Sequence, residues 1–301
     1  MTTIVSHLDA NRRHDAVLLF DVADGNPNGD PDAGNLPRVD PETMQGLVSD
    51  VAIKRKIRDW VDATRGSQER FKIYVQQGAF LSDKQERAYS ERNLKKGSKE
   101  QKDQQTAQNW MCENFFDVRT FGAVMGVTDY KAGQVRGPVQ FTFARSIDPI
   151  VPMDVSITRV ALTNAKEERQ ATDANAEGAT HGTMGRKTLV PYGLYRAQLF
   201  INPHFGKRTG FDEADLAAIW EALERMWDLD RSASRGMTAC RGLYVFSHDS
   251  ALGNAPAHTL FDRVTVARRP GVAAPRAFAD YEVRIDDGGL PTGVALTRLV
   301  G

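Results

Sequence analysis

The chain has 301 residues, 41% of them hydrophobic and 26% charged, which is ordinary globular composition and enough to bury a large core. Basic and acidic residues number 39 each, so the overall positive charge of a free-standing nucleic-acid-binding protein is absent. Two distant cysteines, Cys112 and Cys240, provide no disulfide framework, and neither a signal peptide nor an 18-residue apolar run occurs. We therefore expect a cytoplasmic protein that makes no membrane contact.

The chain begins with a strand, a loop and a helix. Residues 14–24, HDAVLLFDVAD, form an apolar run that predicts a buried strand. Residues 25–41 are crowded with Gly, Pro, Asn and Asp, which predicts a loop built from turns. Residues 42–61, ETMQGLVSDVAIKRKIRDWV, predict a basic helix.

One face of this helix changes character along its length. Leu47 and Val51 begin an apolar stripe, and Lys54 and Arg58 follow at helical spacing. We expect this end of the helix to leave the core and to face either an anionic ligand or water. In the second case Asp50 pairs with Lys54 on a solvated helix end.

Three segments of different polarity follow. Residues 70–77, RFKIYVQQ, predict a short strand. Residues 82–109 have almost no apolar stripe, which predicts a solvent-facing helical insertion or partial disorder. Residues 109–125 regain hydrophobicity and should attach the insertion to the body.

Residues 137–150, GPVQFTFARSIDPI, alternate clearly enough to predict a strand with Val139, Phe141 and Phe143 on one face. Aromatic side chains on a sheet stack bases in some RNA-binding proteins, but more often they form core. We favour the core.

Residues 152–191 read as an excursion between two strands. Residues 155–164 and 187–201 predict the strands, and the segment between them is polar with a Gly-rich end that carries Met184, Arg186 and Lys187. A long loop of this kind is usually functional or disordered.

The last part of the chain starts with an amphipathic helix at 211–230, capped by Asp212. A small, basic link at 231–242 leads to a strand at 242–250, and two further β segments follow. The order strand, helix, strand, then strand, helix, strand predicts an α+β fold of the split βαβ, ferredoxin-like type.

The acidic loop is a candidate metal site. Asp24, Asn26, Asn28 and Gly29 match positions of a calcium-binding loop, but Asn35 stands where a bidentate Glu is required.

A pair of carboxylates, Asp30 and Asp32, is a rival site for a metal-dependent nuclease. The six histidines have no metal-ligand spacing. We expect neither a cofactor nor a bound metal.

Several long segments resemble one known family. They are residues 14–61, DVRTFGAVM (117–125), GPVQFTFARSIDPI (137–150) and GTMGRKTLVPYGLY (182–195). Together they resemble the backbone subunit of type I CRISPR Cascade complexes, the seventh Cas family of the RAMP superfamily. The similarity is greatest to the type I-C form in the Csd/Csh branch.

The resemblance implies one elaborated domain shaped like a hand. An RRM-like palm would comprise residues 10–77, 117–151 and 192–301, a helical fingers insertion residues 78–116, and a β-hairpin thumb residues 152–191. Copies of the subunit would polymerise along CRISPR guide RNA, beside other Cascade subunits, and the guide would pair with a target DNA strand.

The resemblance also implies RNA contacts on the helix, the thumb and the basic link. The residues are Ser49, Lys54, Arg55, Arg58, Met184, Arg186, Lys187, Ser234 and Arg235. The expected function is non-catalytic RNA binding. A ribonuclease using Asp30 and Asp32 is the alternative, and a protein–protein interaction module is the third possibility.

Overall fold

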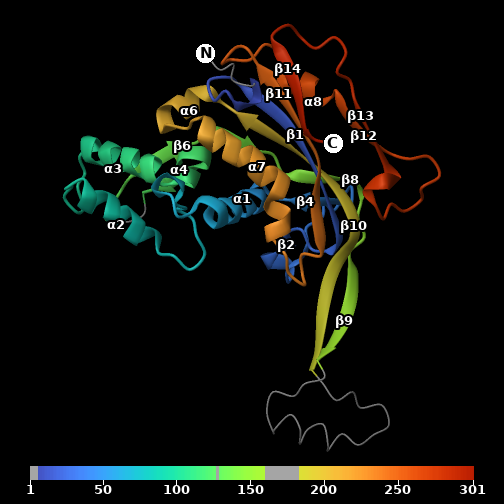
Figure 1. Cartoon of the computed structure of the whole chain (residues 1–301). Coiled ribbons are helices and arrows are strands. Elements are labelled where there is room, and N and C mark those ends of the chain that lie inside the picture. Colours follow the sequence, from blue (N-terminus) through green and yellow to red (C-terminus); the bar gives the residue numbers. More distant parts are fainter. Residues whose placement is uncertain (1–5, 127–128, 160–182) are drawn as a thin grey trace, which may run out of the picture.

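The apolar runs of the sequence form a central antiparallel sheet (Figure 1). The computed structural model describes residues 6–126, 129–159 and 183–301, and only the backbone at 158, 159, 183 and 184. The strands of the sheet are β1 (His14–Gly25), β4 (Gln45–Val48), β7 (Val139–Phe141), β8 (Ala144–Pro149), β9 (Met153–Arg159), β10 (Thr183–Ile201), β11 (Met237–His248) and β14 (Val294–Val300). Their order is β14-β11-β1-β10-β8-β4, with β7 and β9 also paired to β10.

Helices and small strand pairs surround this sheet. The α-helices are α1 (Asp50–Arg65), α2 (Leu81–Glu91), α3 (Gln101–Asn114), α4 (Phe116–Phe121), α6 (Pro203–Thr209), α7 (Glu213–Leu229) and α8 (Ala257–Phe261). The strand pairs are β2 (Gly29–Asp30) with β3 (Leu36–Pro37), β5 (Gly122–Met125) with β6 (Gly133–Arg136), and β12 (Val264–Arg268) with β13 (Tyr281–Ile285). Short 3-10 helices are η1 (Ser6–Leu8), η2 (Pro31–Ala33), η3 (Glu69–Phe71) and η4 (Phe278–Asp280).

Alternation along β1 gives each face of the sheet its own core. Leu18 and Phe20 pack with α1 and α7, and the Phe20 ring lies 4.6 Å from that of Trp227 in α7. Val17 and Leu19 point to the opposite face and pack with α8, β12 and β13. The protein is therefore a mixed α+β structure whose sheet is covered on both sides, and the predicted strand at 14–24 is confirmed.

The predicted helix at 42–61 starts eight residues later than expected, and this part of the prediction is wrong. Residues 45–48 form β4, which pairs with β8, and the backbone N–H of Gly46 donates to the Ser146 hydroxyl at 2.8 Å. The helix begins at Asp50 after Ser49 as N-cap. Pairing with a strand about a hundred residues away in sequence outweighs the local helical pattern.

Two predicted strands also differ. Residues 70–77 are not a strand, because the Asp117 carboxylate accepts the N–H groups of Tyr74 and Val75 at 2.7 and 3.0 Å in place of a neighbouring strand. The predicted strand at 137–150 is broken into β7 and β8, so Phe143 does not continue the buried face and is 51% exposed.

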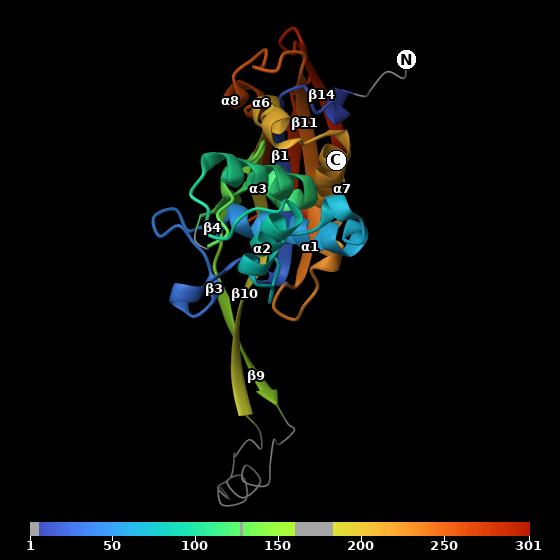
Figure 2. The same cartoon turned by 90° about the vertical axis from the view of Figure 1, so that its left-hand side faces the viewer.

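The helical insertion, whose helices α2 and α3 lie next to each other in Figure 2, has a core of its own. The helical insertion predicted at 82–109 is confirmed as α2 and α3, and most of its residues are exposed. Trp110, Met111 and Phe115 of the following hydrophobic segment pack with Tyr89 and attach the insertion as expected. The amphipathic helix predicted at 211–230 is also confirmed, as α7 with Asp212 in a capping box.

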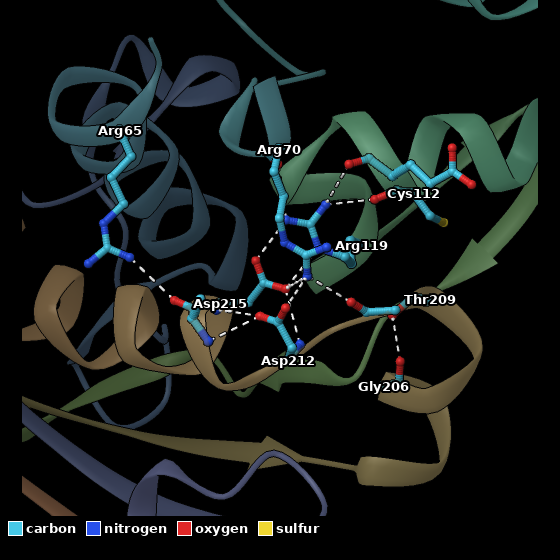
Figure 3. A network of polar contacts seen from close by, with 11 residues as sticks. Arg65, Arg70, Cys112, Arg119, Gly206, Thr209, Asp212 and Asp215 are labelled. Atoms are coloured by element: carbon cyan, nitrogen blue, oxygen red, sulfur yellow. Dashed lines mark hydrogen bonds and ion pairs between the residues drawn. The ribbon is translucent and has the colours of Figure 1, made fainter. Parts of the chain in front are cut away.

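Arg119 in α4 joins the insertion to α7 and is fully buried (Figure 3). Its Nε and Nη2 donate to the two carboxylate oxygens of Asp215 at 2.8 and 2.7 Å. Nη1 donates to the carbonyl of Cys112 at 2.6 Å and Nη2 to the carbonyl of Arg70 at 3.0 Å. The buried charge pair is thus almost completely hydrogen-bonded, which is the condition for tolerating it in a core.

An arm projects from the sheet (Figures 1 and 2). It is an antiparallel hairpin in which β9 pairs with the first part of β10, from Thr183 opposite Arg159 to Leu189 opposite Met153. The remainder of β10 continues into the central sheet beside β1. The polar segment at 160–182, expected to carry a mobile tip, lies outside the described residues.

Among the described residues, no helix combines the length and the apolar character that crossing a bilayer would require.

His14, at the start of β1, is a buried neutral imidazole. Its Nε2 lies 2.9 Å from the carbonyl oxygen of Asp9, which can only accept, so Nε2 carries the proton. Its Nδ1 then accepts from the Ser247 hydroxyl at 3.0 Å. Burial lowers the pKa of His14 to about 4.

A lowered pKa in the folded state means that the unfolded chain takes up the proton first as the pH falls. The stability contributed by neutral His14 is present above about pH 6.5 and is lost between there and about pH 4. We expect the wild-type protein to lose roughly 2 kcal/mol of unfolding free energy from this group by about pH 5. Urea denaturation at neutral and acidic pH should show a smaller loss for His14→Gln, while the exposed control His204→Gln should behave as wild type. Equal pH dependence in all three proteins would contradict this assignment.

Candidate nucleic-acid interface

A groove of about 810 Å³ lies where four distant segments of the chain meet. They are the loop after β1, the start of α1, the segment 75–77 and the link between α7 and β11. Acidic side chains on its walls are Asp59 and Asp230. The cationic side chains are Arg38, Arg55, Lys56, Arg58 and Arg235. This excess of positive charge on a neutral chain suits a polyanionic ligand.

The groove depends on a close crossing of two backbones. A Cβ at Gly25, the last residue of β1, would lie 2.0 Å from the carbonyl oxygen of Arg235. A Cβ at Gly236, where φ is +61°, would lie 2.3 Å from a carbonyl oxygen of β1. The N–H of Asn26 donates to the carbonyl of Ser234 at 2.7 Å. The crossing therefore fixes the predicted residues Ser234 and Arg235 beside the loop after β1.

Ser49 connects this loop to α1. Its backbone N–H and its hydroxyl both donate to Oδ1 of Asn28, each at 2.9 Å. The side chain is nearly buried, at 9% exposed. Ser49 lines the groove, and its two hydrogen bonds to Asn28 hold the N-terminus of α1 beside it.

Arg55 is the predicted residue with the most accessible charge in the groove. Its side chain is 60% exposed, and its Nη2 donates to Oε1 of Gln77 at 2.8 Å. The carboxylate of Asp59 lies 3.8 Å from its Nε, a long and exposed pairing that contributes little. Most of the guanidinium is therefore available to a ligand.

Lys56, Asp230 and Arg235 share one end of the groove. The Asp230 carboxylate contacts the ammonium of Lys56 and lies 3.5 Å from Nε of Arg235. Burial, and after it the Arg235 charge, lower the pKa of Lys56 to about 7. Lys56 is buried and engaged by Asp230, so Arg235, whose side chain is 30% exposed, is the more accessible cation at this end.

Lys54 and Arg58 do not leave the core as expected. Lys54 is 9% exposed and donates to Asp50 at 3.0 Å and to Gln140 at 3.3 Å. Nε of Arg58 donates to the buried carboxylate of Asp117 at 2.8 Å. The alternative pairing of Lys54 with Asp50 is confirmed, although in a buried and not a solvated position. RNA contacts by these two side chains remain a prediction, and both already hold structural ion pairs.

The arm places its basic residues near the same groove. Lys187 contacts the carbonyl of Ala233 in the α7–β11 link, so the arm touches the segment that carries Arg235. Arg186 is 77% exposed, with Asp154 at 3.8 Å. The side chain of Met184, the predicted wedge, lies outside the described residues.

The acids of the nuclease alternative have structural contacts. Oδ1 of Asp30 accepts the N–H of Asp32 at 3.2 Å and caps η2, and Nη2 of Arg38 lies 3.3 Å from it. Asp32 is exposed. Across residues 6–126, 129–159 and 183–301, no three His, Cys, Asp or Glu side chains gather as a metal ion would need.

The amide oxygens of the calcium alternative are occupied by the loop itself. Oδ1 of Asn26 accepts the N–H of Asn28 at 3.1 Å, and Oδ1 of Asn28 is bound by Ser49. Two of the three side chains that would supply calcium ligands, those of Asn26 and Asn28, are therefore turned to other partners, and the residues do not fit this ion.

Sequence reasoning missed two cations of the groove, Arg38 and Lys56. Arg38 follows a Gly- and Pro-rich segment whose path cannot be read from local pattern, yet its buried Nε has no acceptor in the described part of the chain. Lys56 belongs to the same basic helix as Arg55. Helical periodicity predicted Lys54 and Arg58 as the exposed basic residues of this helix and did not single out Lys56.

A family model described as CRISPR-associated protein Cas7 matches residues 12–286. The chain belongs to the Cas7 family. A curated relative from Haloferax volcanii, also described as CRISPR-associated protein Cas7, is 24% identical over 240 residues. That alignment covers 70% of this chain and 64% of the relative, so less than two thirds of the relative's length is represented.

Solved structures with similarity to this Cas7-family chain have low sequence identity. A CRISPR RNA-guided surveillance complex in a pre-nicking state gives a TM-score of 0.49 at 15% identity, covering 78% of each chain. Another CRISPR RNA-guided surveillance complex gives 0.46 at 16% identity, covering 78% of this chain and 68% of the other. A type III-B Cmr-beta complex bound to cognate target RNA gives 0.41 at 11% identity, covering 78% and 61%.

Proposed function

We propose that this chain is a non-catalytic backbone subunit that binds guide RNA in a CRISPR surveillance complex of the type I-C form. Membership of the Cas7 family supports the class of complex. The subtype rests on the resemblance of the sequence segments. Partners in this proposal are the guide RNA, the target DNA strand paired to it, further copies of the chain and other Cascade subunits, all in the cytoplasm.

The groove is the observation that carries the proposal. Arg55 and Arg235 lie 180 residues apart in sequence, yet α1 and the α7–β11 link bring them to one surface together with Arg38. Guanidinium groups bind phosphate bidentately, and a row of them follows a nucleic-acid backbone without reading its sequence. RNA sequence is then irrelevant to the protein, as a guide-carrying subunit requires.

The arrangement of the sheet supports the hand-like interpretation. Strands β11, β1, β10 and β8 are adjacent in that order, and α1 and α7 lie over one face. In this proposal the order corresponds to a split βαβ palm, with β7 and β8 taking the place of the strand expected at 70–77. The insertion containing α2 and α3 then corresponds to the fingers, and the arm of β9 and β10 to the thumb.

Replacing Arg55 and Arg235 together by Gln tests the proposal. We expect the affinity for single-stranded RNA to fall about tenfold or more, and the slope of log affinity against log salt to decrease by about 1 to 2, because two phosphate contacts are lost. Fluorescence anisotropy over a salt series measures both quantities. Binding should be cooperative and should differ little between RNA sequences.

The matched control is Arg87→Gln with Arg225→Gln, two exposed arginines on α2 and α7 that lie outside the groove. The control has the same net charge as the groove variant. A difference in RNA affinity between the two variants therefore reports on the groove and not on net charge. Equal affinity in both variants would contradict the proposal. Magnesium-dependent RNA cleavage that disappears in Asp30→Asn would replace it with the nuclease alternative.

A further inference from the structure

A second pocket, of about 370 Å³, lies where the arm leaves the sheet. It is formed by the connection from β8 to β9 around Ile150, by Tyr192 and Gly193 of β10, and by the loop between β12 and β13. The pocket and the groove share no lining residue. The Tyr192 side chain belongs to the core between the sheet and the β12–β13 pair, whereas α1 of the groove packs on the opposite face.

The charged side chains that line this pocket are Arg268, Arg276 and Asp148, so cations are in excess. Nη1 of Arg268 donates to the carbonyl of Ala273 at 2.9 Å, and Nη1 of Arg276 to the carbonyl of Pro275 at 2.9 Å. Both side chains are exposed, and within the described ranges neither has a carboxylate within ion-pair distance. Most N–H groups of the two guanidiniums therefore have no acceptor in the part of the protein that the structure describes.

The remaining polar groups of the pocket are already engaged. The Tyr281 hydroxyl donates to Asp148 at 2.8 Å, and the Tyr192 hydroxyl to Asp21 at 2.9 Å. The two rings lie 6.4 Å apart and form a fixed wall. Val151, at 75% exposed, adds an apolar surface at the rim. The pocket thus offers two guanidinium groups beside an apolar wall, which matches a phosphodiester flanked by a base or a ribose.

We propose that this pocket is a second nucleic-acid site, which holds the phosphodiester backbone of a single strand other than the guide. The choice of a nucleic acid over an acidic protein segment rests on the proposed function of the chain. The site lies outside the guide groove, so both can be occupied at once. Its two cations, Arg268 and Arg276, come from the end of β12 and from the loop between β12 and β13.

Fluorescein-labelled oligothymidylate, which cannot pair with a guide lacking adenine tracts, is the probe. Its affinity is measured by anisotropy for the full-length protein saturated with guide RNA. We expect Arg268→Gln with Arg276→Gln to weaken probe binding about tenfold and to leave guide affinity unchanged. Arg284→Gln with Arg225→Gln, a pair of exposed, carboxylate-paired arginines, is the charge-matched control and should bind the probe as wild type.

Three outcomes would overturn the inference. The first is equal probe binding by the pocket variant and the control. The second is complete displacement of the probe from wild type by guide RNA. The third is binding of an acidic peptide to the pocket while the probe does not bind. A failure of the proposed function is distinct, because it is seen as unaltered guide affinity in the Arg55 and Arg235 variant. The same probe titration on the guide-free protein then still reports on Arg268 and Arg276.

Discussion

Replacing Arg119 by Met will lower the free energy of unfolding by about 3 to 5 kcal/mol, the largest effect expected of any single change described above. Asp215 would remain buried, with 0% of it exposed, and would keep one cationic partner, Arg70, at 2.8 Å. The carbonyl of Cys112 would lose its donor as well. Chemical denaturation of the purified variant measures the loss.

The matched control for this change is Arg87→Met. Arg87 pairs with Glu91 on the exposed surface of α2, with 53% of its side chain exposed, and such pairs contribute less than about 1 kcal/mol. The double variant Arg119→Met with Asp215→Leu should recover part of the lost stability, because it removes both charges from the core. A small effect of Arg119→Met alone would show that water replaces the guanidinium and that the pair does not fix the joint between the insertion and α7.

Replacing Gly25 by Ala will impair RNA binding through geometry, without removing any charge. The added Cβ would meet the carbonyl of Arg235 at 2.0 Å, so the α7–β11 link must move away from β1. The hydrogen bond from Asn26 to Ser234 would be strained, and Arg235 would leave the groove. We expect a loss of about 1 to 3 kcal/mol in stability from overpacking, and RNA affinity reduced about tenfold.

Gly34→Asn is the control for Gly25→Ala. Gly34 lies in the same loop with φ at +62°, a Cβ there meets nothing within 4 Å, and Asn tolerates this backbone conformation. Its RNA affinity should match wild type in the same anisotropy assay. If Gly25→Ala binds RNA as tightly as Gly34→Asn does, the backbone crossing is not what positions Arg235.

The sequence predicted those elements whose pattern is local. The strand of β1 and the capped helix α7 were found because apolar periodicity and a capping box are properties of neighbouring residues. The segment 70–77 was misread because its N–H groups are satisfied by Asp117, about forty residues further along the chain. Such a partner cannot be inferred from spacing.

The candidate site was predicted in part for the same reason. Arg55 and Arg235 were found because their segments resemble a known family, and the structure brings both to one groove. Lys54 and Arg58 have the right spacing for an exposed basic stripe, but Asp50 and Asp117 draw them into buried ion pairs. Arg38 depends on the path of a turn-rich loop and has no periodic signal.

Strand β10 has a mechanical consequence. Leu189 pairs with Met153 in the arm, and the next residue, Val190, pairs with Gly25 in the sheet, so no unpaired linker separates the two. The arm is therefore a continuous extension of the sheet, and the twist of the sheet sets its direction. A load applied to the arm is shared by the backbone hydrogen bonds between β10 and β1. Gly25, which ends that ladder, precedes the loop whose residues line the groove from Asn28 onward. Bending the arm and opening the groove are therefore coupled through one strand.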